Sequence, residues 1–310
     1  MRPGDTQYTW TVQQQVFPRV SVDASYTHRI FHGFFITDDL TRHAGGTFQG
    51  AVGQSYETYT INVPTDSRLP DGGGYPVTVY VATPDAGRVA ANNYLVREET
   101  FGEPRDSHWD GFEYNGNARL RGGLTVSLGA STGRGVVNTC ASQQNYGNPD
   151  PRNCNNTEDW QTTARGLASY TIPKVDVLVS ATLRSSPPVQ QTVTWQVNTA
   201  QVITPLLGHT PFGATATTNI TVTDNAHKLY LGGRRTTLDM RFAKVLRFAG
   251  RRADIGVDLN NALNTNYATA YNGTIINGTD LPDTTRPGGF LAPTAIYNPR
   301  FVRFNFTLNF

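Results

Sequence analysis

The sequence is poor in both of the residue classes that dominate an ordinary soluble domain. Of its 310 residues, 38% are hydrophobic and only 16% are charged, whereas globular domains average about 45–50% and about 25%. Thr, Asn, Gly, Ser and Gln make up the difference. This composition is typical of strands with one polar face and of long polar loops. It fits a β-barrel with a wet interior, and it also fits a secreted all-β domain.

Other features that the sequence lacks bear on its location and its partners. No run of about 20 apolar residues is present, so we expect no transmembrane helix. The net charge is only +2, which gives no reason to expect a nucleic-acid partner. Residues 1–10 contain no apolar stretch of the kind found in signal peptides. We therefore expect either a cytoplasmic protein or a chain whose natural N-terminus lies upstream.

Motifs that would indicate catalysis or metal binding are also absent. The sequence contains no Gly-x-Ser-x-Gly and no zinc-protease motif, so we expect no enzyme and no cofactor. His28 and His32 share a strand face, but four residues of extended chain place them about 13 Å apart. That separation is too large for one metal ion, and we expect no metal site.

The only two cysteines flank one polar loop. Cys140 and Cys154 lie on either side of a stretch rich in Gly, Pro and Asn. This arrangement predicts a disulfide, which would close a loop of about 15 residues and contribute roughly 3 kcal/mol. A disulfide favours an oxidising compartment, and hence the interpretation that a leader sequence has been left out.

Nine segments alternate apolar and polar residues, which predicts β-strands with two unlike faces. Each is close to the 9–11 residues that a tilted strand needs to cross a bilayer. Aromatic residues gather at their ends, as in the girdles of membrane barrels: Tyr8, Trp10, Trp109, Trp160, Tyr170 and Phe248. The segments are 8–16, 20–28, 109–120, 124–134, 160–171, 175–184, 236–248, 253–263 and 299–310.

The connections alternate between tight turns and long polar stretches. The long ones are 29–108, 135–159, 185–235 and 264–298, and all exceed the roughly 15 residues that are usual in compact domains. Long loops on one side and short turns on the other are characteristic of outer-membrane barrels. Nine strands are an odd number, and lipid tolerates no open sheet edge. The segments therefore predict part of a larger barrel.

The polar faces of the predicted strands carry charged residues that we expect to line an aqueous lumen. They would contact a plug or a solute, or they would pair with one another across neighbouring strands. The predicted lumen-facing residues are Asp23, Glu113, Arg119, Arg165, Arg184, Asp239, Arg241, Asp254 and Asp258.

Six segments, taken in order and spacing, resemble the C-terminal half of a TonB-dependent receptor. The similarity is to the branch of these outer-membrane transporters that carries an N-terminal carboxypeptidase-regulatory-like domain. The segments are SVDASYTHRIFHGFFITDD (21–39), NARLRGGLTVSLGASTGR (117–134), RGLASYTIPKVDVLVSATL (165–183), LDMRFAKVLRF (238–248), VDLNNALN (257–264) and NPRFVRFNFTLNF (298–310).

The resemblance implies that residues 1–310 are the C-terminal part of an outer-membrane β-barrel. The fold would be all-β, an antiparallel up-and-down transmembrane meander forming about nine of about 22 strands. The function would be energised uptake of a scarce or large solute, such as an iron chelate, an oligosaccharide or a peptide. The signal peptide, TonB box and plug are lacking, so TonB would act only through an N-terminal part outside these residues.

The resemblance also implies a location, the bacterial outer membrane, and makes the lipid of that membrane a partner. Phe304, Phe306, Leu308 and Phe310 would be an assembly signal that the barrel assembly machinery recognises. The alternative hypothesis is a soluble secreted all-β binding module, for example one that binds carbohydrate. In that protein the apolar face of the last strand would pack against a second sheet.

Overall fold

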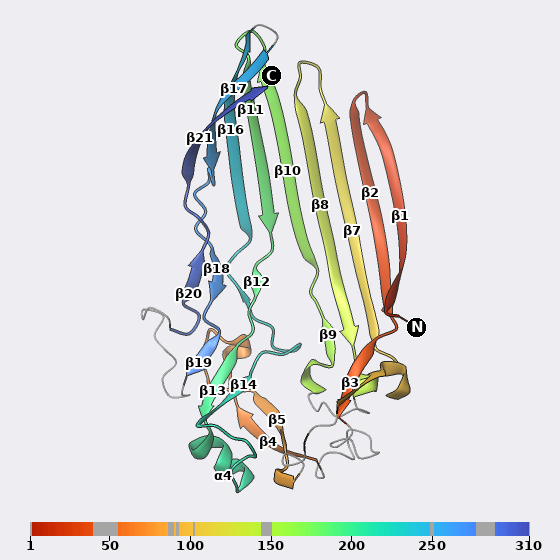
Figure 1. Ribbon diagram of the computed structural model, residues 1–310, viewed down its shortest axis with the longest axis vertical. Coiled ribbons are helices and arrows are strands. Elements are labelled where there is room, and N and C mark those ends of the chain that lie inside the picture. Colours follow the sequence, from red (N-terminus) through yellow and green to blue (C-terminus); the bar gives the residue numbers. More distant parts are fainter. Residues whose placement is uncertain are drawn as a thin grey trace.

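Long antiparallel strands dominate the structure, a computed structural model that describes residues 2–39, 55–85, 90, 93–101, 103–143, 151–248, 251–276 and 289–309. Nine of them follow one another across a single sheet in chain order (Figure 1). They are β1 (Gly4–Phe17), β2 (Val20–His32), β7 (Asp106–Arg119), β8 (Thr125–Asn138), β10 (Gln161–Ile172), β11 (Val177–Ser186), β16 (Arg235–Phe248), β17 (Arg251–Asn260) and β21 (Phe301–Asn309).

The structure confirms the predicted all-β fold with a large antiparallel meander of about nine strands. Each predicted segment corresponds to one long strand. A tenth strand, β9 (Asn155–Thr157), pairs with the end of β8. The sheet does not close into a barrel, because β1 and β21 lie at its opposite edges (Figure 1).

Short turns join the long strands at one end of the sheet, at the top of Figure 1. Arg19 has φ 70° in the turn between β1 and β2. Gly122 and Gly123, with φ 90° and 88°, reverse the chain between β7 and β8. Glycine reaches this region without steric cost, so the RGG sequence forms the tight turn that the pattern predicts.

The long connections gather at the other end and form strands of their own (Figure 1). They carry the pairs β3 (Phe35–Asp39) with β6 (Asn93–Arg97), β4 (Tyr56–Asn62) with β5 (Pro76–Ala82), β12 (Val189–Gln190) with β15 (Tyr230–Leu231), and β18 (Ala268–Tyr271) with β20 (Pro293–Ile296). A three-stranded sheet combines β14 (Thr217–Thr221), β13 (Thr194–Asn198) and β19 (Thr274–Ile276).

Helical structure is limited to short segments within the described ranges. A π-type turn, Thr199–Ile203, runs into α4 (Thr204–Leu207), and α3 (Cys140–Gln143) follows β8. Three 3-10 turns cover Pro70–Gly72, Glu98–Phe101 and Pro151–Asn153. No helix in the described part of the chain is long and apolar enough to cross a membrane.

The main hydrophobic core lies in the connections and not in the large sheet. We call the described parts of three connections, 55–83, 187–234 and 264–298, the loop module. Its buried apolar residues come from all three connections, for example Val77, Trp195 and Phe290. The sequence predicts these stretches only as polar loops. That expectation is wrong in part, because their apolar residues pack with partners far along the chain.

Candidate functional site

The register of the long strands separates the sheet into an apolar face and a polar face. Side chains directly opposite one another across neighbouring strands share a face. One row across eight strands is entirely apolar: Val20, Ala118, Val126, Ala168, Ala181, Met240, Leu259 and Val302. The adjacent row is entirely polar: Arg119, Thr125, Ser169, Ser180, Arg241, Asp258 and Arg303.

The apolar face is uncovered. Val12 is 73% exposed, and Leu128 is 57% exposed in the middle of the sheet. Among the described residues, no second sheet and no helix packs over this face (Figure 1). Soluble monomers rarely expose contiguous apolar patches larger than a few hundred Å². A face of this extent needs a partner, either lipid or protein.

The last strand places its aromatic residues on this same face. Phe304 lies opposite Val257, and Phe306 lies opposite Ile255. Phe304 is 80% and Phe306 is 64% exposed, and Leu308 is half-buried. Phe310 lies outside the described residues. The aromatic side chains of β21 therefore do not pack against a second sheet, as the soluble alternative would require.

A belt of rings runs along the apolar face from β1 to the start of β10, near the loop end. Successive ring centroids are 6.4 Å apart from Tyr8 to Trp10, 5.7 Å from Trp10 to Tyr26, and 5.0 Å from Tyr26 to Phe112. Phe112 then lies 6.0 Å from Trp160. Amphipathic rings in such belts lie at the level of lipid headgroups in membrane proteins.

Trp109 does not belong to this belt, although it stands at the end of a predicted strand. It lies opposite Arg29 and Gly135, on the polar face. Its indole covers Gly111 and Gly133, where an added Cβ would lie 1.8 Å and 2.5 Å from ring atoms. The two glycines leave the space that the ring occupies.

Polar groups follow the belt on its loop side. Asp110 accepts a hydrogen bond from the Tyr26 hydroxyl (2.7 Å) and lies 2.8 Å from Nδ1 of His28. The ring of His28 is 5.6 Å from that of His108, whereas His32 lies near Thr6. No group of three or more His, Cys, Asp or Glu in the described ranges is arranged to hold a metal ion.

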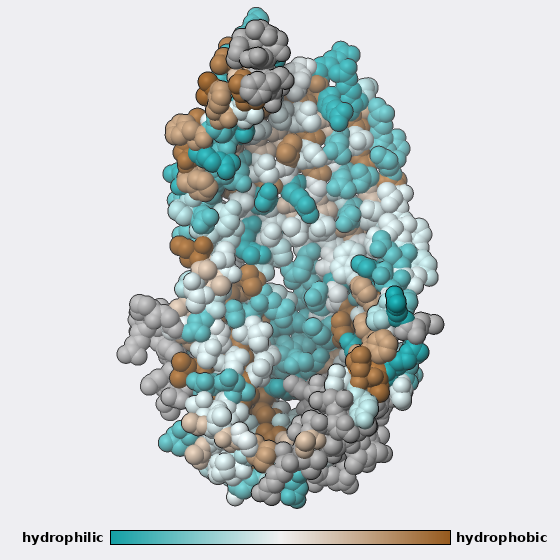
Figure 2. Space-filling model, in the orientation of Figure 1, coloured by the Kyte–Doolittle hydropathy of each residue, from teal (hydrophilic) through white to brown (hydrophobic). Residues whose placement is uncertain are grey.

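All nine charged residues predicted for a lumen lie on the polar face, the face turned toward the reader in Figure 2. Some have partners. Asp258 lies 3.0 Å from Arg303 and 3.7 Å from Arg241. Asp23 accepts a hydrogen bond from the Asn115 amide at 2.8 Å. Because β1 and β21 do not meet, the structure places these residues on one face but encloses no lumen.

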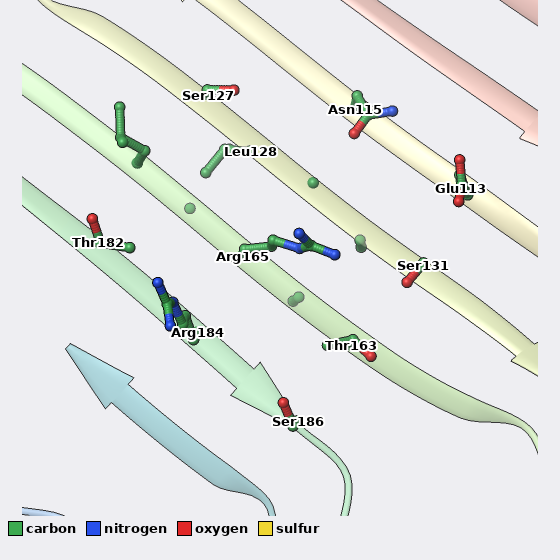
Figure 3. A pocket seen from close by; sticks show the side chains of 15 residues that line it. Glu113, Asn115, Ser127, Leu128, Ser131, Thr163, Arg165, Thr182, Arg184 and Ser186 are labelled. Atoms are coloured by element: carbon green, nitrogen blue, oxygen red, sulfur yellow. The ribbon is translucent and has the colours of Figure 1, made fainter. Parts of the chain in front are cut away.

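A hollow of about 830 Å³ lies on the polar face, over β7, β8, β10 and β11. Figure 3 shows Arg165 and Arg184 reaching into it from neighbouring strands. Its other polar walls are an acid, an amide and hydroxyl groups: Glu113, Asn115, Ser127, Ser131, Thr163, Thr182 and Ser186. Its walls are more polar than those of three other hollows along the same sheet.

Cys140 and Cys154 form a disulfide with their Cα atoms 4.8 Å apart. The bond joins the turn after β8 to the start of β9. The backbone N–H of Thr139 also donates a hydrogen bond to the carbonyl of Cys154. The structure thus has the pairing that the spacing of the two cysteines predicts.

The loop module is held together by polar contacts between connections. Arg68 donates hydrogen bonds to the carboxylate of Asp66 and to the carbonyl of Phe290, and it lies 5.2 Å above the ring of Phe290. The bonds from Arg68 hold the pKa of Asp66 below its usual value. Burial raises the pKa of Tyr59, in the core of the module, to about 12. The module is therefore a defined structure at the loop end of the sheet.

Two residues have structural roles that the sequence pattern does not indicate. Arg303 was placed on the polar side of the last strand but not identified as the partner of Asp258. Asn261, almost fully buried with φ 50°, donates hydrogen bonds to the carbonyls of Thr265 and Asn298. It thereby ties the end of β17 to the start of β21. The signal in the sequence is the pair of asparagines at the end of β17, in NNAL (260–263).

Comparisons with known proteins do not identify a family for this chain. No protein-family model matches this chain, and no curated protein matches it.

Proposed function

We propose that this chain is the barrel segment of an outer-membrane TonB-dependent receptor for energised uptake of a scarce or large solute. The observation that carries the proposal is the apolar face of the meander, which spans nine strands, is uncovered, and is bordered by a belt of aromatic rings. The lengths of β1, β7, β8 and β16, 14 residues each, are sufficient to cross a bilayer at a tilt.

In this proposal the open edges of β1 and β21 pair with further barrel strands, because lipid leaves no water to satisfy unpaired backbone groups. The loop module then faces the outside, where long barrel loops lie, and contributes to capture of the solute. Coupling to TonB needs a plug and a TonB box, which residues 1–310 do not supply. The barrel assembly machinery would act on the aromatic last strand.

Tryptophan fluorescence in brominated lipid tests whether the apolar face touches hydrocarbon. Of the four tryptophans, Trp10 and Trp160 belong to the ring belt, Trp109 lies on the polar face, and Trp195 is in the core of the loop module. We expect brominated acyl chains to quench the W109F/W195F double variant strongly. The W10F/W160F double variant, which keeps the two other tryptophans, should be quenched little.

Equal quenching of the two double variants would reject the proposal. So would recovery of the native protein in the soluble fraction without detergent, which is the result expected for the alternative hypothesis of a secreted all-β binding module. Vesicles with unbrominated lipid of the same composition provide the control for changes in folding.

A further inference from the structure

Arg165 and Arg184, in the hollow of the polar face, are directly opposite one another on β10 and β11. Like charges in this position destabilise an antiparallel pair. Arg241 and Arg303 also share a row, but the carboxylate of Asp258 lies between them. Neither guanidinium of the Arg165–Arg184 pair makes a hydrogen bond or ion pair within the described parts of the chain. No carboxylate in the described residues offsets the two like charges.

The surroundings of the pair are polar and roomy. Asn115 and Gly129 continue the row beyond Arg165, and the side chain of Asn115 lies over Gly129, where an added Cβ would be 3.0 Å from Oδ1 of Asn115. The only acid on its walls, Glu113, stands in a different row, opposite Ser25 and Ser131. The volume of about 830 Å³ falls within the range of small-molecule sites.

We propose that Arg165 and Arg184 form a binding site for an oxyanion, the carboxylate or phosphate group of a polar solute. Each guanidinium presents N–H groups in a planar fork that matches such oxygens. An anion held between the two arginines would turn their repulsion into attraction. The hydroxyls of Thr163 and Thr182, on the same two strands, would bind neutral polar parts of the solute.

The assignment of this group to a transported solute rests on the proposed function, because the polar face would then border the solute path. Binding of the anion itself requires only the two strands and the hollow. The two proposals can therefore fail separately.

Titration with inorganic phosphate tests the site on the whole chain in detergent micelles, followed by calorimetry. We expect R165Q and R184Q each to weaken phosphate binding roughly tenfold or more, as is usual when a charged hydrogen-bond partner is lost. R119Q is the matched control. Arg119 lies on the same face but opposite Thr125, and its loss should leave the affinity within about twofold.

The R184E variant separates a lost site from a damaged fold. A glutamate opposite Arg165 should raise the unfolding temperature, because attraction replaces repulsion, while phosphate binding is lost. Phosphate should raise the unfolding temperature of the wild type but not that of R184E. Absence of phosphate binding by the wild type, or equal affinities of wild type, R165Q and R184Q, would overturn the site.

Two outcomes distinguish this proposal from the proposed function. If the protein is soluble but binds phosphate through Arg165 and Arg184, the anion site is supported and the membrane receptor is rejected. If brominated lipid quenches the tryptophan fluorescence but the protein does not bind phosphate in this way, the receptor is supported and the site is rejected.

Discussion

Gly111 leaves the space in which the indole of Trp109 lies flat on the polar face. A β-carbon there would be 1.8 Å from Cη2 of the ring, so the ring or the strand must move. We expect G111V to lower the free energy of unfolding by about 1–3 kcal/mol, the usual cost of overpacking. Equilibrium denaturation in urea measures the change.

Gly116, on the same strand but on the apolar face, provides the matched control. Nothing lies within 4 Å of a Cβ added there, and valine has the higher strand propensity. G116V should therefore leave stability unchanged or raise it slightly. A loss in G116V as large as that in G111V would show that the indole does not cause the effect.

The same residues show what the sequence could and could not predict. Alternation along 109–120 assigns a face to every residue, and the even-numbered positions are the apolar ones. Trp109 was nevertheless expected in a girdle because it stands at the end of the run. Gly111 has no side chain, so the alternation of polar and apolar residues cannot be followed from position 113 back to Trp109. The second glycine under the ring, Gly133, lies on β8, where no local pattern predicts the contact.

At the scale of the element, the disulfide fixes the connection between β8 and β10. The bond joins Cys140 and Cys154, 14 residues apart. Replacing both by serine should lower the free energy of unfolding by roughly 3 kcal/mol, because the unfolded chain regains the freedom of the loop. Chemical denaturation with and without reductant measures the difference.

The wild type under reductant should approach the stability of the C140S/C154S variant, and the variant should not respond to reductant. A variant as stable as the oxidised wild type would show that the bond contributes nothing. Because the long strands of the sheet lie outside the closed loop, we expect the register of β8 and β10 to remain.

Long and short strands differ in how well the sequence predicts them. The nine long strands were predicted within a few residues, because alternation over many positions is a strong signal. The strands of the connections were missed. They have between two and seven residues, and partners such as Thr194 and Thr274 on β13 and β19 are distant in the chain. Pairing at such distance depends on tertiary packing, which no short window of sequence contains.

At the scale of the whole molecule, the same substitution should destabilise the protein to different extents on the two faces of the sheet. Leu128 is 57% exposed on the apolar face, and Leu167, on the neighbouring strand, is 46% exposed on the polar face. We expect L128R to cost about 2–4 kcal/mol in membrane stability, the penalty for arginine at mid-bilayer. L167R should cost little, because its guanidinium would remain in water.

Folding into lipid vesicles, followed by urea titration, measures both variants against the wild type. Similar losses in L128R and L167R would contradict a lipid-facing assignment of the apolar face. A larger loss in L167R than in L128R would reverse the orientation that we propose for the sheet.

The construction of the loop module has a consequence for biogenesis. Its interior combines Val77, Trp195 and Phe290, which leave the ribosome far apart in time. The apolar side chains of the first connection, such as Val77 and its hairpin partner Ile61, have only one another as partners until the later two connections have been translated. During that interval the nascent protein would be a substrate for holding chaperones and for quality-control proteases. Packing of the core of the loop module would thus be among the last steps in the folding of this protein.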